Sequence, residues 1–95
     1  MRDQQRIKTI NNYVADKYGV TIEDIMSNDT KEVNVKARQM CMYLAYRSTR
    51  LSNAEVADAY NKKPNSFDIA WKNINAGNDE VKTFIKYAKM DLGYE

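Results

Sequence analysis

The stretch that decides the fold is residues 51–74, LSNAEVADAYNKKPNSFDIAWKNI. Ser52 followed three residues later by Glu55 is the pattern of a capping box, in which each side chain accepts a hydrogen bond from the other residue's backbone N–H. Apolar residues on either side of this pair add a hydrophobic staple. Pro64 suits the first turn of a second helix, because its missing N–H costs little there. The stretch therefore predicts two short helices joined by a turn.

The second of these helices has an apolar stripe and a polar face. The stripe recurs at steps of three and four and consists of Phe67, Ala70, Trp71 and Ile74. Aromatic residues at this spacing indicate a side that packs in the core rather than a platform for stacking nucleobases. The other face carries Asn65, Ser66, Asp68, Ile69, Lys72 and Asn73. Two short helices arranged in this way have the outline of a helix-turn-helix.

Apolar periodicity, caps and breakers predict four more helices in the rest of the chain. They cover about Arg6 to Tyr18, Thr21 to Met26, a long helix after the loop 27–31, and Val81 to Leu92. The long helix has the widest apolar stripe: Val33, Ala37, Met40, Cys41, Leu44, Ala45 and Ser48. It should be the central rod, with neighbours on more than one side. We expect one all-α domain over residues 1–95, with about six helices around the helix-turn-helix.

The composition excludes several classes of function. The chain has 95 residues, no histidine and only one cysteine, Cys41, so it lacks the usual general base and the commonest metal ligand. No carboxylate pair, nucleophile motif or glycine-rich phosphate loop stands out. We therefore expect no enzyme, no metal, no cofactor and no small-molecule substrate.

The same composition predicts a cytoplasmic protein that does not bind membranes. A lone cysteine forbids an internal disulfide and suits a reducing compartment. The longest apolar run, residues 40–46, is far shorter than a membrane span, and the first residues are not followed by the apolar segment of a secretory signal.

The distribution of charge is uneven along the chain. The net charge is only +2, yet residues 36–63 hold six basic and two acidic residues. Such polarity suits a surface for phosphate, and it is equally ordinary for a solvated face.

Three stretches resemble a known family. Residues 14–27, VADKYGVTIEDIMS, look like the opening of the C-terminal DNA-binding domain of the bacterial replication initiator DnaA. Residues 36–45, KARQMCMYLA, are similar to the family's central helix, and residues 51–60 match the first helix of its helix-turn-helix. The resemblance covers roughly residues 10–74. It implies a six-helix, Trp-repressor-like fold and double-stranded DNA as the partner.

The resemblance and the polarity of the helix-turn-helix together yield candidate DNA-binding residues. They are Lys36, Arg38, Gln39, Lys62, Lys63, Asn65, Ser66, Lys72 and Asn73. The first three resemble the family's contacts to the DNA backbone, and the two lysines of the turn suit phosphate as well. Asn65 and Ser66 suit either base readout or helix capping. Lys72 and Asn73 could reach a phosphate or a base edge.

The chain departs from the family at two places that matter for DNA binding. The family's loop after the second helix is strongly basic and sends an arginine into the minor groove, but residues 28–32 read NDTKE here. Of the family's signature at the recognition helix, residues 62–66 keep only the basic residue and the final hydroxyl. The minor-groove contact therefore does not carry over, and the resemblance does not imply binding to the initiator's own box sequence. A different sequence, or binding dominated by the DNA backbone, stays open.

Two hypotheses follow from these observations. The first is a DNA-binding module for replication or transcription control, for example of a phage or mobile element. The second is a protein-interaction or structural module that keeps the fold without sequence-specific DNA binding, since Asp29, Glu32 and Asp68 would repel phosphate. A protein partner or a homodimer is compatible with both hypotheses.

Overall fold

The computed structural model describes residues 2–94. These residues contain six α-helices and no strand. The helices are α1 (Arg2–Tyr18), α2 (Ile22–Met26), α3 (Glu32–Ser48), α4 (Asn53–Ala59), α5 (Pro64–Asn75) and α6 (Asp79–Leu92). The predicted all-α class and the number of helices are confirmed. α1 begins four residues before the predicted start, because residues 2–5 contain no helix breaker and extend the helix with polar side chains.

The helix starts follow the predicted capping devices. Thr21 accepts a hydrogen bond from the N–H of Asp24, whose carboxylate accepts one from Thr21 in return. Ser52 and Glu55 make the same reciprocal pair at the start of α4. Each box satisfies two backbone groups that a helix end would otherwise leave without a partner. The capping boxes therefore fix where α2 and α4 begin.

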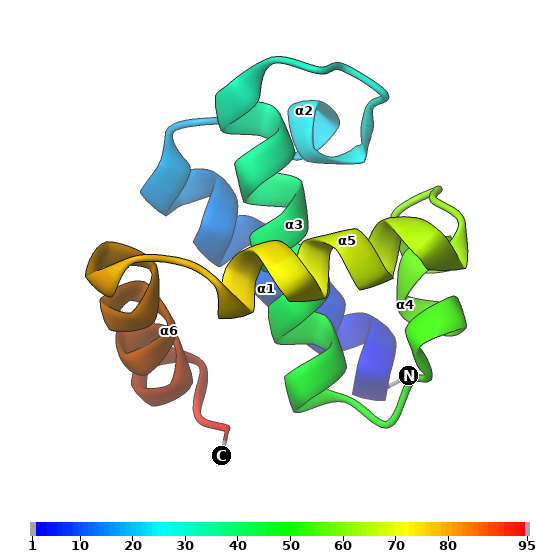
Figure 1. Cartoon of the computed structure of the whole chain (residues 1–95). Helices are drawn as coiled ribbons and strands as arrows, with labels where there is room; N and C mark the ends of the chain where they lie inside the picture. Colours follow the sequence, from blue (N-terminus) through cyan, green and yellow to red (C-terminus); the bar gives the residue numbers. More distant parts are fainter. Residues whose placement is uncertain (1, 95) are drawn as a thin grey trace.

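The central helix, α3, is surrounded by the rest of the fold. Six consecutive residues, 40–45, are buried, so neighbours cover every side of α3 over that stretch. α1 packs along one side of α3, and α5 crosses it on another (Figure 1). The prediction of a central rod is confirmed. Val33 was expected on the apolar stripe but is 38% exposed, because at this end of α3 the neighbouring Asn34, 3% exposed, is on the buried side instead.

The last helix, α6, packs on the domain as its apolar stripe predicts. The ring of Phe84 meets the edges of Tyr13 and Tyr18 on α1, with centroids 5.9 and 5.2 Å apart. Arg6 donates a hydrogen bond of 2.6 Å to the carbonyl oxygen of Leu92 at the end of α6. These contacts join the N-terminal and C-terminal helices.

Two half-buried tyrosines, Tyr18 and Tyr94, lead to a prediction on alkaline unfolding. Burial raises the pKa of Tyr18 to about 12, with smaller effects of Cys41 and Glu80, and burial likewise raises that of Tyr94 to about 12. The unfolded chain therefore releases these protons first, so the stabilisation is complete below pH 10 and is lost between about pH 10 and 12. Urea unfolding at several pH values should show this decline.

The variant Tyr18→Phe is the control for that decline. It removes one of the ionisable groups and keeps the ring that packs against Phe84. The free energy of unfolding of this variant should depend less steeply on pH above pH 10. An unchanged decline in the variant would show that Tyr18 does not contribute to it.

Candidate nucleic-acid interface

α4 and α5 form the predicted helix-turn-helix. Between them, Asn61 has a φ of 59°, a left-handed conformation that asparagine tolerates better than most residues. This conformation lets the N–H of Lys62 bond back to the carbonyl oxygen of Ala57 at 2.8 Å, which closes the end of α4. The chain then turns into α5 at Pro64. The turn is therefore fixed by backbone hydrogen bonds and not only by the packing of the two helices.

The position of α5 depends on aromatic packing against α3. Trp71 stacks on Tyr43 with ring centroids 4.7 Å apart, and Phe67 meets Tyr46 at 5.0 Å. Phe67 and Ile74 are buried, and Trp71 packs against the core while partly exposed. The prediction that these residues are core rather than a platform for nucleobases is confirmed. Because this side of α5 is taken by α3 and α4, its opposite side must face solvent.

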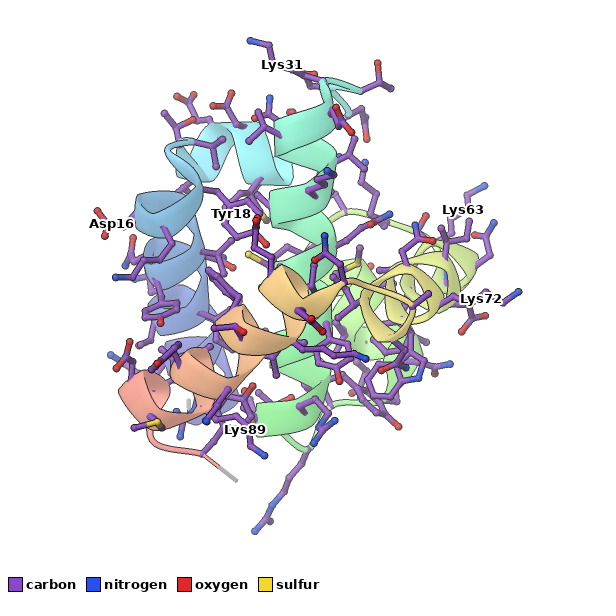
Figure 2. The ribbon with its side chains drawn as sticks, turned by 60° about the vertical axis from the view of Figure 1, so that its left-hand side comes forward. Asp16, Tyr18, Lys31, Lys63, Lys72 and Lys89 are labelled. Carbon is purple, nitrogen blue, oxygen red and sulfur yellow. The ribbon has the colours of Figure 1, made fainter. Side chains whose placement is uncertain are left out.

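The solvent side of α5 carries the polar residues that the sequence predicts there. Asn65, Lys72 and Asn73 are exposed and Ser66 is half-buried. Figure 2 shows Lys63 and Lys72 pointing away from the body of the molecule near α5. The alternative in which Asn65 or Ser66 caps the helix is wrong, because the N-cap of α5 is Lys63 and no side chain caps this helix end.

Two of the candidate residues on α3 extend this surface. The amide nitrogen of Asn73 donates to the amide oxygen of Gln39 across the two helices, at 3.4 Å. Lys36 pairs with Glu32 at 3.4 Å, but 65% of its side chain remains exposed. Lys36, Gln39 and Asn73 all line a groove of about 600 Å³ that reaches to the start of α6.

Arg38 is turned inward, in contrast to the expectation that it lies on the DNA backbone. The residue is only 5% exposed. Its guanidinium donates to the carbonyl oxygens of Asp24 (2.9 Å), Ile25 (2.6 Å) and Asp29 (3.3 Å). Carbonyls at the end of a helix lack intrahelical partners and attract a cation, which explains this placement at the end of α2. We therefore leave Arg38 out of the interface.

Lys62 holds the same loop from the other side. Its ammonium donates to the side-chain oxygen of Asn28 at 2.6 Å and to the carbonyl oxygen of Ser27 at 3.4 Å. Burial, together with the nearby charge of Arg38, lowers the pKa of Lys62. The loop 27–31 is thus tied both to α3 and to the turn of the helix-turn-helix. One hydrogen-bond donor of this ammonium is left for a phosphate.

The loop and α5 enclose a second, smaller hollow of about 250 Å³. Its lining includes Arg38, Gln39, Lys62, Ser66 and Ile69. With the groove beside Asn73, this hollow connects the candidates on α3, in the turn and on α5 into one surface. We call this surface the α5 face, and it consists of Lys36, Gln39, Lys62, Lys63, Asn65, Ser66, Asp68, Ile69, Lys72 and Asn73.

Comparison with known families agrees with this geometry. A sequence model of the family described as bacterial dnaA protein helix-turn-helix matches residues 7–67, which is more than half of the chain. The chain belongs to this family. No curated protein and no solved structure matches it. The match confirms the resemblance and the fold, and membership of this family supports DNA binding in general.

Other types of site are not evident in the part of the chain that the structure describes. Within residues 2–94, no group of histidine, cysteine or acidic side chains is arranged to hold a metal ion. In the same residues, no helix is both long and apolar enough to cross a membrane. The α5 face is therefore the best-defined candidate site of this dnaA-family domain.

One basic residue of the loop 27–31 was not among the candidates. It is Lys31, which is exposed at the N-cap of α3 and lies apart from Lys63 and Lys72 (Figure 2). The carboxylate of Asp29 accepts the backbone N–H of Lys31, which shapes the loop locally. The signal for Lys31 was present in the sequence, since the loop is the segment that is strongly basic in the family. Its exposure, however, appears only in the structure.

The inward position of Arg38 predicts a loss of stability on its removal. Arg38→Ala leaves three buried or half-buried carbonyl groups without their charged donor, so the free energy of unfolding should fall by about 2 to 3 kcal/mol. Urea unfolding followed by circular dichroism measures this change. The matched control is Lys36→Ala, two residues away, which breaks only an exposed ion pair and should change the stability by less than ~0.5 kcal/mol. Equal stability of the two variants would contradict the structural role of Arg38.

Proposed function

We propose that the protein binds double-stranded DNA by placing α5 in the major groove, in the control of replication or transcription. The observation that carries the proposal is the α5 face. It is the solvent side of the second helix of a dnaA-family helix-turn-helix, and it is rich in hydrogen-bonding side chains with lysines at its margins. A recognition helix needs these properties, because it must reach base edges while its flanks neutralise phosphates.

The lysines around α5 supply the phosphate contacts of this proposal. Lys63 and Lys72 are exposed, Lys36 is held only by an exposed ion pair, and Lys62 retains a free donor. Glu32, in the first turn of α3, already pairs with Lys36, so a phosphate would share or replace this carboxylate as the partner of the ammonium.

The side chains at the start of α5 supply the base contacts. The N-terminal residues of a recognition helix are the ones that approach base edges. Asn65 is fully available there, and an asparagine amide can bind the N6 and N7 atoms of adenine together. Ser66, beside it, can donate to or accept from either kind of base. Asn73 lies two turns further along and shares its amide with Gln39.

The proposal predicts strong salt dependence of binding. Four lysines that each neutralise a phosphate release counterions, so log K should fall with log salt at a slope of about −3 to −4. Fluorescence anisotropy with labelled duplex DNA at several salt concentrations measures this slope. A slope near zero, or no binding at low salt, would contradict the proposal. A protein complex that survives high salt would then favour the alternative of an interaction module.

Single substitutions separate phosphate contacts from base contacts. Lys63→Ala should weaken binding several-fold on every duplex and reduce the salt slope by about 0.9. Asn65→Ala should instead change the preference among sequences selected from a random library. The control Lys86→Ala removes the same charge from the exposed side of α6 and should alter binding little. Equal losses for Lys63→Ala and Lys86→Ala would show that only the net charge matters.

A further inference from the structure

An apolar side chain stands in the middle of the otherwise polar α5 face. Ile69 is 52% exposed, although α5 buries other apolar residues on its opposite side. On a helix, the neighbours of a residue are those three and four positions away. For Ile69 these are Asn65, Ser66, Lys72 and Asn73, and each of them carries a hydrogen-bonding group. Ile69 is thus the apolar centre of a polar surface.

The fold alone does not account for this isoleucine. Single exposed aliphatic residues are common, but the position of Ile69 coincides with the centre of the proposed recognition surface. Its β-branched side chain lowers helix propensity, so a preference for helix formation does not explain its presence. Its inner edge faces the hollow of about 250 Å³ that Val35 and Met42 also line, while its outer half stays open to solvent.

Major-groove chemistry offers one apolar partner for such a side chain. Among the four bases, only thymine presents a methyl group there, on C5. An isoleucine cannot donate or accept a hydrogen bond, so it discriminates by contact with that methyl group. Polar base edges placed against Ile69 would lose water without gaining a partner.

We propose that Ile69 is a specificity-determining residue that requires thymine at the base pair opposite the middle of α5. The inference rests on the proposed binding of α5 in the major groove. Asn65 and Asn73, one turn to either side of Ile69, carry amides suited to adenine. The preferred site should therefore contain a thymine between positions at which adenine is read.

The test uses the single methyl group that distinguishes thymine from uracil. Duplexes bound by the protein are first selected from a random library, and each thymine of the best site is then replaced by deoxyuridine, one at a time. Base pairing is unchanged by this replacement. At one thymine the affinity should fall about fourfold, the value of one buried methyl group at ~0.8 kcal/mol.

Variants of Ile69 show whether this side chain reads the methyl group. In Ile69→Ala, the same replacement by deoxyuridine should have no effect on affinity. In Ile69→Val, the replacement should still lower the affinity by most of the fourfold. The control Met90→Ala shortens another exposed apolar side chain, on α6, and should keep the full fourfold effect. All these changes lie on the surface, and circular dichroism verifies that the fold is retained.

The outcomes separate this inference from the proposed function. If the protein binds its selected site but no thymine is sensitive to deoxyuridine, or if the sensitivity persists in Ile69→Ala, the role of Ile69 is wrong while DNA binding stands. If the protein binds no duplex even at low salt, the proposed function fails, and the inference fails with it.

Discussion

The burial of α3 on all sides is the constraint on which the rest of the structure depends. Residues 40–45 are six consecutive apolar residues, so apolar side chains occupy the whole circumference of the helix there and all of them are buried. α1 and α5 must therefore pack on different sides of it. Only the two ends of α3 are left to reach the surface, and Lys36 and Gln39 belong to its N-terminal end. The same constraint that builds the core also places these two residues beside the outer side of α5.

The helix-turn-helix is positioned by aromatic contacts and by two cations. Trp71 and Phe67 of α5 pack on Tyr43 and Tyr46 of α3. The polar side of α5 therefore cannot rotate inward without loss of this packing. On the other side of the surface, Arg38 holds the end of α2 and the loop that follows it. Lys62 holds that loop to the turn. The loop and α5 are therefore positioned relative to each other before any DNA arrives.

Much of this arrangement could be predicted from the sequence. The capping boxes at Thr21 and Ser52, the proline at the start of α5 and the apolar stripes depend on residues close together in the chain. Local hydrogen bonds and helical periodicity are enough to predict such features. The resemblance to the dnaA family, which rests on residues from α1 to α4, also predicts the topology of the six helices.

The roles of the two cations could not be predicted. Arg38 sits next to the buried stripe of α3, where a helical pattern alone allows it to point inward or outward. Its partners are carbonyl oxygens of a loop whose path depends on the tertiary fold. Lys62 likewise finds its partner, Asn28, 34 residues away in the chain. The position of Ile69, in contrast, follows from helical periodicity, which already places it on the polar face, and its 52% exposure confirms this.

The central claim is that the α5 face is the surface that meets DNA. A ¹H–¹⁵N NMR titration of the protein with duplex DNA at low salt tests it most directly, because every backbone amide reports separately. The account predicts that the shifts concentrate at residues 36–39 and 62–73, with little change in α6. Shifts centred on α6, or a spectrum that DNA leaves unchanged, would contradict it.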